Sequence, residues 1–270
     1  MKARRFRWLF AAAVLAALLA VASPRLPGLY WGYRSDNPVR RGLRRANELG
    51  CFHCHGDLGR AGIPDPAAAG KDVPSWSGGV WMMYVKDESD IRTLILHGSA
   101  GMHHGHESDE DAGDEQAIEM PAYGDLLGGS DLGDLVAIFK IASGMNVPPA
   151  NSAARGGYDV ARRWQCFSCH GPGGSGGLPN PRSFTGYVPG WYGVDFADLV
   201  RSRGEFDAWI TKGVTPRLQA SSLASFFTRR QRIEMPEYSA MKTGDLDALW
   251  AYTRWLEETG GGLRGVQPAW

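Results

Sequence analysis

Apolar residues recur at helical spacing in several stretches of the 270-residue chain, and no stretch shows the alternation typical of a strand. Leu132, Leu135, Val136 and Phe139 stand at i, i+3, i+4 and i+7, so a helix would place them on one face. The pattern predicts a core-facing helix over 131–142, with Asp131 at its start to cap it and complement its dipole. Comparable segments predict further helices over 38–49, 89–96, 152–164, 205–211 and 245–257, the last beginning at Asp245. The segments between them are rich in glycine and proline and predict loops.

These predicted helices form two sets, because the chain repeats itself with an offset of 115 residues: Cys51 returns as Cys166 and Met120 as Met235. Two runs carry the repeat most clearly, and they are Cys51-Phe52-His53-Cys54-His55 with Cys166-Phe167-Ser168-Cys169-His170, and Ile118-Glu119-Met120-Pro121 with Ile233-Glu234-Met235-Pro236. Single positions that also match include Gly42 and Gly157, Pro64 and Pro179, Trp76 and Trp191, and Gly98 and Gly213. A repeat of this length indicates two copies of one structural unit. We therefore expect an all-α chain with a first module over 34–145 and a second module over 151–262.

The two C-x-x-C-H runs contain all four cysteines of the protein. On a helix, positions i, i+3 and i+4 share one face, so the two thiols and the imidazole would point the same way. This arrangement is typical of covalent haem attachment, in which the thiols become thioethers and the histidine binds the iron. Four cysteines could instead form one zinc site, although zinc requires no histidine after each pair. A thioredoxin-like pair would need a β-α-β pattern, which is absent. We predict two haem c groups, held by Cys51 and Cys54, and by Cys166 and Cys169.

The order of elements resembles a class I cytochrome c over about residues 38–260: a leading helix, C-x-x-C-H, a helix ending in glycine, Met-Pro and a closing amphipathic helix. The resemblance implies that each module wraps a few helices around one haem. It also implies that His55 and Met120 bind the first iron, and that His170 and Met235 bind the second. Each methionine follows its histidine by 65 residues. A methionine is often core filler, but two at identical repeat positions favour a shared role.

The same resemblance implies supporting residues around each haem. Pro64 and Pro179 lie nine residues after the proximal histidines, where a proline carbonyl would accept the second imidazole N–H. Trp76 and Trp191 would either donate an indole N–H to a haem propionate or serve as large core aromatics.

Packing of the leading helix against the closing helix is a further implication of the resemblance. Gly42 and Gly157 would be the positions of closest contact, with Ala137 and Ala251 facing them. Glycine at such a crossing allows two backbones to approach.

Methionine and histidine ligation together favour ferrous iron and leave no open site, which is the chemistry of an electron carrier rather than an enzyme. The predicted arrangement of two fused cytochrome modules resembles proteins of the cytochrome c4 type and the dihaem subunits of respiratory complexes. We expect one-electron transfer between a donor and an acceptor protein, with respiratory-complex subunits among the candidate partners. The alternative is a dihaem oxidoreductase of the peroxidase or thiosulfate dehydrogenase type, in which one haem is catalytic.

Residues 1–33 have the features of a signal peptide or an N-terminal membrane anchor. A cationic stretch to Arg7 precedes an apolar run from Trp8 to Ala22, which is shorter than the roughly 20 residues of a spanning helix. Flanking aromatic residues and the cationic front are also compatible with an uncleaved anchor. We expect the protein on the periplasmic side of the bacterial inner membrane, either tethered or soluble after cleavage.

Charge is distributed unevenly between the two halves of a chain whose formal net charge is zero. Residues 34–150 carry 10 Lys or Arg against 18 Asp or Glu, whereas residues 151–270 carry 14 against 11. No basic field indicates nucleic-acid binding. Six of the acids follow a histidine-rich run within residues 101–115. This segment could bind zinc or copper or supply a distal histidine, but its polarity favours a solvated loop that steers a basic partner.

Overall fold

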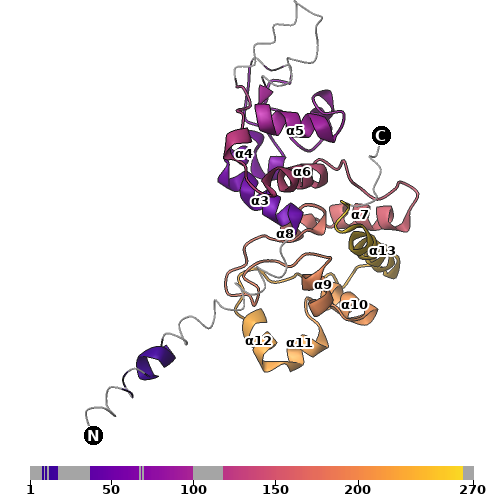
Figure 1. Cartoon of the computed structure of the whole chain (residues 1–270). Coiled ribbons are helices and arrows are strands. Elements are labelled where there is room, and N and C mark those ends of the chain that lie inside the picture. The colour runs from indigo at the N-terminus through magenta and orange to yellow at the C-terminus, as the bar shows by residue number, and fades with distance from the viewer. Residues whose placement is uncertain are drawn as a thin grey trace, which may run out of the picture.

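The computed structural model describes residues 37–66, 68, 70–99 and 118–263, together with residues 8, 10 and 12–17, which are helical. The predicted targeting segment lies mostly outside the described residues, and the histidine-rich acidic segment 101–115 lies entirely outside them. In the parts of the chain that are described, no helix is both long and apolar enough to span a membrane. Figure 1 shows the described helices arranged in two groups that follow one another along the chain.

The first module contains α3 (Pro38–Glu48), α4 (Cys51–His55), α5 (Glu88–His97) and α6 (Asp131–Ala142). Asn37 begins α3, because its side chain accepts a hydrogen bond of 2.9 Å from the Arg40 N–H and Pro38 occupies the first helical position. Asp87 and Asp90 form a capping box at the start of α5. Local sequence signals therefore account for where α3 and α5 begin.

The second module repeats this order and adds three short helices. It contains α7 (Ala153–Arg163), α8 (Phe167–His170), α9 (Val194–Leu199), α10 (Arg203–Lys212), α11 (Pro216–Ala220), α12 (Ser222–Thr228) and α13 (Thr243–Thr259). The six predicted helices are confirmed with ends shifted by at most two residues, whereas α9, α11 and α12 were not predicted. Described residues form no strand beyond two isolated bridges, so the all-α prediction is also confirmed.

The leading and closing helices of each module cross and pack, α3 on α6 and α7 on α13. The predicted glycines lie at both crossings: a Cβ on Gly42 would overlap the Asp134 carbonyl, and one on Gly157 would overlap the Ala248 carbonyl. The atoms nearest to Gly42 belong to Asp134 and Ile138, and those nearest to Gly157 belong to Ala248 and Tyr252. The predicted facing residues, Ala137 and Ala251, are therefore not the nearest ones.

The prediction that Asp131 and Asp245 cap the closing helices is also wrong. Neither helix has a side-chain cap bond. Asp131 instead accepts a hydrogen bond of 3.0 Å from Arg45, and Asp245 accepts one of 3.0 Å from Arg163. Both acids therefore tie the closing helix to the leading helix of the same module.

The two modules contact each other through a buried ion pair. Arg40 on α3 reaches Asp195 at the start of α9 with an N–O distance of 3.2 Å, and both residues are only 4% exposed. The Arg40 guanidinium also lies 4.0 Å from the centre of the Tyr187 ring, whose hydroxyl donates to Asp195 over 3.1 Å. Asn146 donates to the Gly262 carbonyl over 2.9 Å elsewhere in the same contact. These bonds fix the modules against each other.

Candidate functional site

Each C-x-x-C-H run forms a short helix at the wall of a cavity. Cys51, Cys54 and His55 line a cavity of about 140 Å³ in the first module, and their repeat partners line one of about 330 Å³ in the second. Residues next to α4 set its ends, because Gly50 and Gly56 have φ angles of 77° and 70°, which end the helix on either side. Each module thus presents two thiols and one imidazole to a single cavity.

Both imidazoles are oriented by a proline carbonyl. The Nδ1 atom of His55 lies 2.7 Å from the Pro74 oxygen, and that of His170 lies 2.9 Å from the Pro189 oxygen. Because a carbonyl oxygen only accepts, Nδ1 must carry the hydrogen. Burial lowers the pKa of both histidines below the ordinary value, so the rings are neutral near pH 7. The Nε2 atom then keeps a lone pair that is available to a metal.

The carbonyls at Pro64 and Pro179 were predicted to make these bonds, and that prediction is wrong. Pro64 pairs with Asp72 in an isolated antiparallel bridge, as Pro179 does with Tyr187. The bridge folds the loop back, so the proline that reaches the histidine comes 19 residues after it rather than nine. Pro74 and Pro189 also match in the sequence repeat, and that match was the available signal.

The four thiols are separated into two pairs and form no disulfide. Burial raises the pKa of Cys51 and raises that of Cys166 to about 11, so both remain thiols near neutral pH. A structural zinc site needs thiolates that converge on one point. No group of three or more His, Cys, Asp or Glu side chains that could hold a metal ion is found among the described residues. One zinc site built from all four cysteines is therefore not formed.

Met120 and Met235 line the same cavities as the cysteines and histidines of their modules. Each methionine loop is bound to the preceding helix in the same way: the Tyr123 N–H donates to Ile95 over 3.0 Å, and the Tyr238 N–H donates to Ile210 over 2.9 Å. The chain also passes close to a glycine at the helix end. A Cβ on Gly98 would overlap the Met120 carbonyl, and one on Gly213 would lie 2.6 Å from the Met235 carbonyl.

The tryptophans predicted at the site, Trp76 and Trp191, line the two cavities and contact the histidines. The ring centres of Trp76 and His55 are 5.6 Å apart, and those of Trp191 and His170 are 5.2 Å apart. Their role as large aromatics packed at the site is confirmed. Donation of the indole N–H to a haem propionate stays a prediction.

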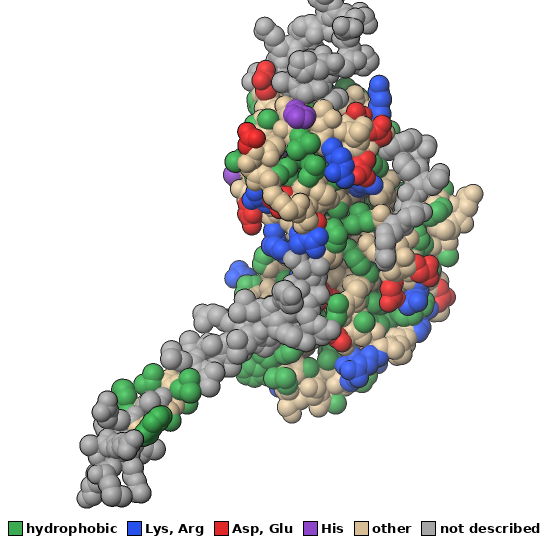
Figure 2. All heavy atoms as spheres, viewed as in Figure 1, with side chains coloured by type: hydrophobic (Ala, Val, Ile, Leu, Met, Phe, Trp, Pro, Cys, Tyr) green, Lys and Arg blue, Asp and Glu red, His purple; other side chains and the backbone are tan. Residues whose placement is uncertain are grey.

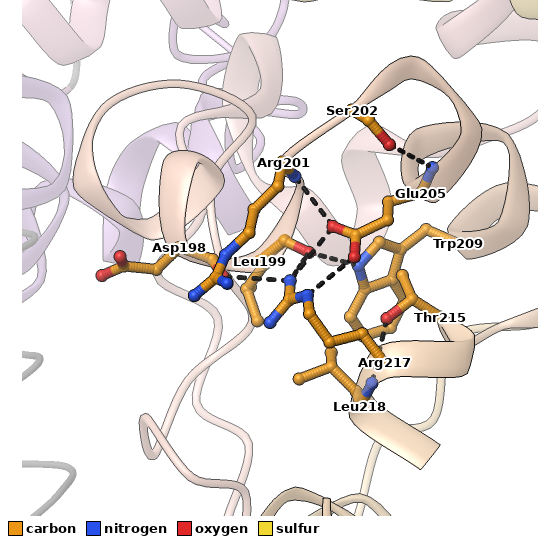
Figure 3. A network of polar contacts seen from close by, with 9 residues as sticks. All are labelled: Asp198, Leu199, Arg201, Ser202, Glu205, Trp209, Thr215, Arg217 and Leu218. Atoms are coloured by element: carbon orange, nitrogen blue, oxygen red, sulfur yellow. Dashed lines mark hydrogen bonds and ion pairs between the residues drawn. The ribbon is translucent and has the colours of Figure 1, made fainter. Parts of the chain in front are cut away.

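In the second module, the helices α11 and α12 form part of the cavity wall, and we call these two helices the roof. The described residues of the first module form no such helical cover. Leu218, Ala224 and Phe227 of this roof line the cavity. Figure 3 shows how α11 is fastened: Arg217 donates to both carboxylate oxygens of Glu205, over 2.7 and 3.1 Å, and to the Leu199 carbonyl over 3.1 Å. The sequence analysis did not identify the contribution of this segment to the cavity.

On the face shown in Figure 2, basic and acidic side chains of the described residues are mixed, and the basic ones form no continuous area. No protein-family model and no curated protein matches the chain. The chemistry of the site must therefore be argued from its own residues.

Proposed function

We propose that the protein is an exported dihaem cytochrome c that carries single electrons between a donor and an acceptor protein. The observation that carries the proposal is the recurrence, in both modules, of two thiols, one neutral imidazole and one thioether on the wall of one largely apolar cavity. Two thiols and an imidazole at this spacing suit covalent haem attachment, and an apolar lining suits a porphyrin. When bound, haem supplies a one-electron iron couple.

The roles of the residues follow from their chemistry. Cys51 and Cys54 would form the thioether links of the first haem, and His55 would bind its iron through Nε2. The Pro74 carbonyl fixes the imidazole ring by holding Nδ1–H, which also makes the ring a stronger ligand. Met120 would complete the ligand set.

The second module repeats these roles with Cys166, Cys169, His170, Pro189 and Met235. Trp191 and Phe167 pack with ring centres 5.7 Å apart beside the second histidine, as Trp76 and Phe52 do at 5.2 Å beside the first. This aromatic packing would keep the histidine in place if the charge on a bound iron changed. Small rearrangement on electron transfer is what a carrier requires.

The fixed contact between the modules supports electron exchange within the chain. The Arg40–Asp195 pair and the bond from Asn146 to Gly262 hold the two cavities in one arrangement. The proposed partners are redox proteins, including subunits of a respiratory complex, on the periplasmic side of the inner membrane. The N-terminal segment would deliver the protein there, as an anchor or as a cleaved signal.

Counting covalent haem tests the proposal. The protein is expressed in cells that mature c-type cytochromes, and its mass is measured after denaturation. We expect two haems in the wild type, one in the variant Cys51→Ala with Cys54→Ala, and one in Cys166→Ala with Cys169→Ala. A wild-type protein without covalent haem would overturn the proposal.

A further inference from the structure

The two methionine loops share their bonds to the preceding helix and upstream of the methionine, but they differ in the bonds made by the methionine backbone itself. In the first module, one residue binds both polar backbone groups of Met120. The Met120 N–H donates to the Ser99 hydroxyl over 2.9 Å, and the Ser99 N–H donates to the Met120 carbonyl over 3.0 Å. Ser99 therefore holds the backbone of the proposed sixth ligand directly.

The second module lacks this clamp. Its matching residue is Val214, which has no hydroxyl group. The backbone differs as well, because Gly98 has a ψ of −164° whereas Gly213 has a ψ of −3°, which turns the chain toward α11 instead of along the methionine loop. Within residues 118–263 and the other described parts of the chain, neither the N–H nor the carbonyl of Met235 makes a hydrogen bond.

The nearest restraint on the second loop lies two residues before the methionine. The Asn180 side chain accepts a hydrogen bond of 2.8 Å from the Ile233 N–H and donates one of 2.9 Å to the Ile233 carbonyl. This bond pair fixes the start of the loop. It leaves the N–H and the carbonyl of Met235 without a partner among the described residues.

The cavity beside Met235 is the larger of the two and reaches solvent, as the cavity beside Met120 also does at Glu119 and Pro121. The cavity beside Met235 measures about 330 Å³, against about 140 Å³ for the cavity beside Met120. Apolar side chains of α12, including Ala224 and Phe227, form part of its wall. Leu223 lines the same cavity while 60% of it is exposed, so the cavity wall reaches solvent at α12. An apolar wall favours a small uncharged molecule over an ion.

We propose that Met235 is the more easily displaced of the two sixth ligands, that a small uncharged iron ligand such as carbon monoxide binds in its place, and that Ser99 prevents this at Met120. The inference rests on the proposed function, because it assumes one haem in each module. With a haem bound, displacement would exchange the Met235 sulfur for the incoming donor as ligand, without net oxidation or reduction. Ser99 acts as a positioning residue, since it touches the backbone of the ligand and not the iron.

Carbon monoxide titration of the reduced full-length protein tests the inference, after its two haems have been confirmed by mass. We expect one carbon monoxide to bind at least tenfold more tightly than the other. The variant Cys51→Ala with Cys54→Ala keeps only the second haem and should retain the tighter site. Equal affinities, or tighter binding at the first haem, would contradict the inference.

Substitution of Ser99 separates its role as a clamp from general stability. Ser99→Ala leaves the Met120 N–H without its partner, so affinity at the first haem should rise about tenfold while the second is unchanged. Ser99→Thr keeps a hydroxyl group and should behave like the wild type. An unchanged first site in Ser99→Ala would show that the hydroxyl does not hold Met120.

Amide hydrogen exchange gives a readout that does not depend on added ligand. The Met120 amide should exchange about tenfold more slowly than the Met235 amide, and Ser99→Ala should remove the difference. Equal exchange in the wild type would overturn the clamp. A protein that contains no haem would instead defeat the proposed function, so the two failures can be told apart.

Discussion

The two modules share a helical frame but differ in what holds and covers their methionine loops. In both, a glycine in the leading helix contacts the backbone of the closing helix, and a proline carbonyl orients the histidine. Ser99 clamps the loop in the first module. Asp65 in the first module and Asn180 in the second accept a hydrogen bond two residues before the methionine, and in the second module α11 and α12 also cover the cavity. The comparison indicates that the repeated frame positions the iron ligands, and that the segments between α5 or α10 and the methionine make the two sites unequal.

The largest expected effect comes from the ion pair that joins the modules. Arg40→Ala leaves Asp195 buried without its cation, and we expect the free energy of unfolding to fall by about 3–5 kcal/mol. Chemical denaturation checks this. The double variant Arg40→Leu with Asp195→Leu removes both charges and should lose less. If the double variant were less stable than Arg40→Ala, the unpaired buried charge of Asp195 would not be the cause of the destabilisation.

The next largest effect is expected at the helix crossings, where replacing the crossing glycine should lower stability alike in both modules. Gly157→Ala places a Cβ against the Ala248 carbonyl, and we expect it to destabilise by about 1–3 kcal/mol or more. Gly156→Ala is the matched control, because its Cβ would meet only the Ala248 side chain at 3.8 Å. Gly42→Ala should match Gly157→Ala. Thermal unfolding of the three variants measures the difference, and a control as unstable as Gly157→Ala would contradict the account.

The roof of the second cavity provides a smaller effect, confined to one module. Arg217→Ala removes the bonds that fasten α11 to Glu205 and Leu199, and we expect a loss of about 1–2 kcal/mol. Amide exchange in α11 and α12 should accelerate while exchange in α5 is unchanged. Arg229→Ala, directly after α12, is a suitable control, since among the described residues its guanidinium bonds only to the Ser225 carbonyl of that helix. Faster exchange throughout both modules would mean that the roof is not a local feature.

The smallest expected effect is a pH dependence at the contact between the modules. Burial raises the pKa of Asp195 to about 6, outweighing the opposite influence of Arg40. A carboxyl whose pKa is higher in the folded than in the unfolded chain binds its proton more tightly when folded. Stability from this group therefore falls as pH rises through that range. From about pH 7 to about pH 5, the wild type should gain about 1 kcal/mol relative to Asp195→Asn. Parallel pH profiles would contradict this.

The helical frame could be read from the sequence because it rests on local signals and a repeat. The apolar stripe on α6 and the matched glycines Gly42 and Gly157 predicted features that the structure confirms. The placement of the cysteines, histidines and methionines at common cavities agrees with the predicted sites. The haem groups and electron transfer remain predictions.

Features that depend on distant contacts could not be read in this way. The Arg40–Asp195 pair joins residues 155 positions apart, and nothing local marks either residue. The carbonyl for each histidine was assigned to Pro64 and Pro179 by resemblance, whereas a loop closed by an isolated bridge brings Pro74 and Pro189 there. The helices α11 and α12 are too short to show a helical period.

Redox titration of the wild type and of the variants Met120→Ala and Met235→Ala tests the central claim most directly. A thioether ligand favours ferrous iron, so each substitution should lower one of two midpoint potentials by more than about 59 mV and leave the other nearly unchanged. Two potentials that respond separately would support one methionine-ligated haem in each module. A potential that does not move when its methionine is removed would contradict that assignment.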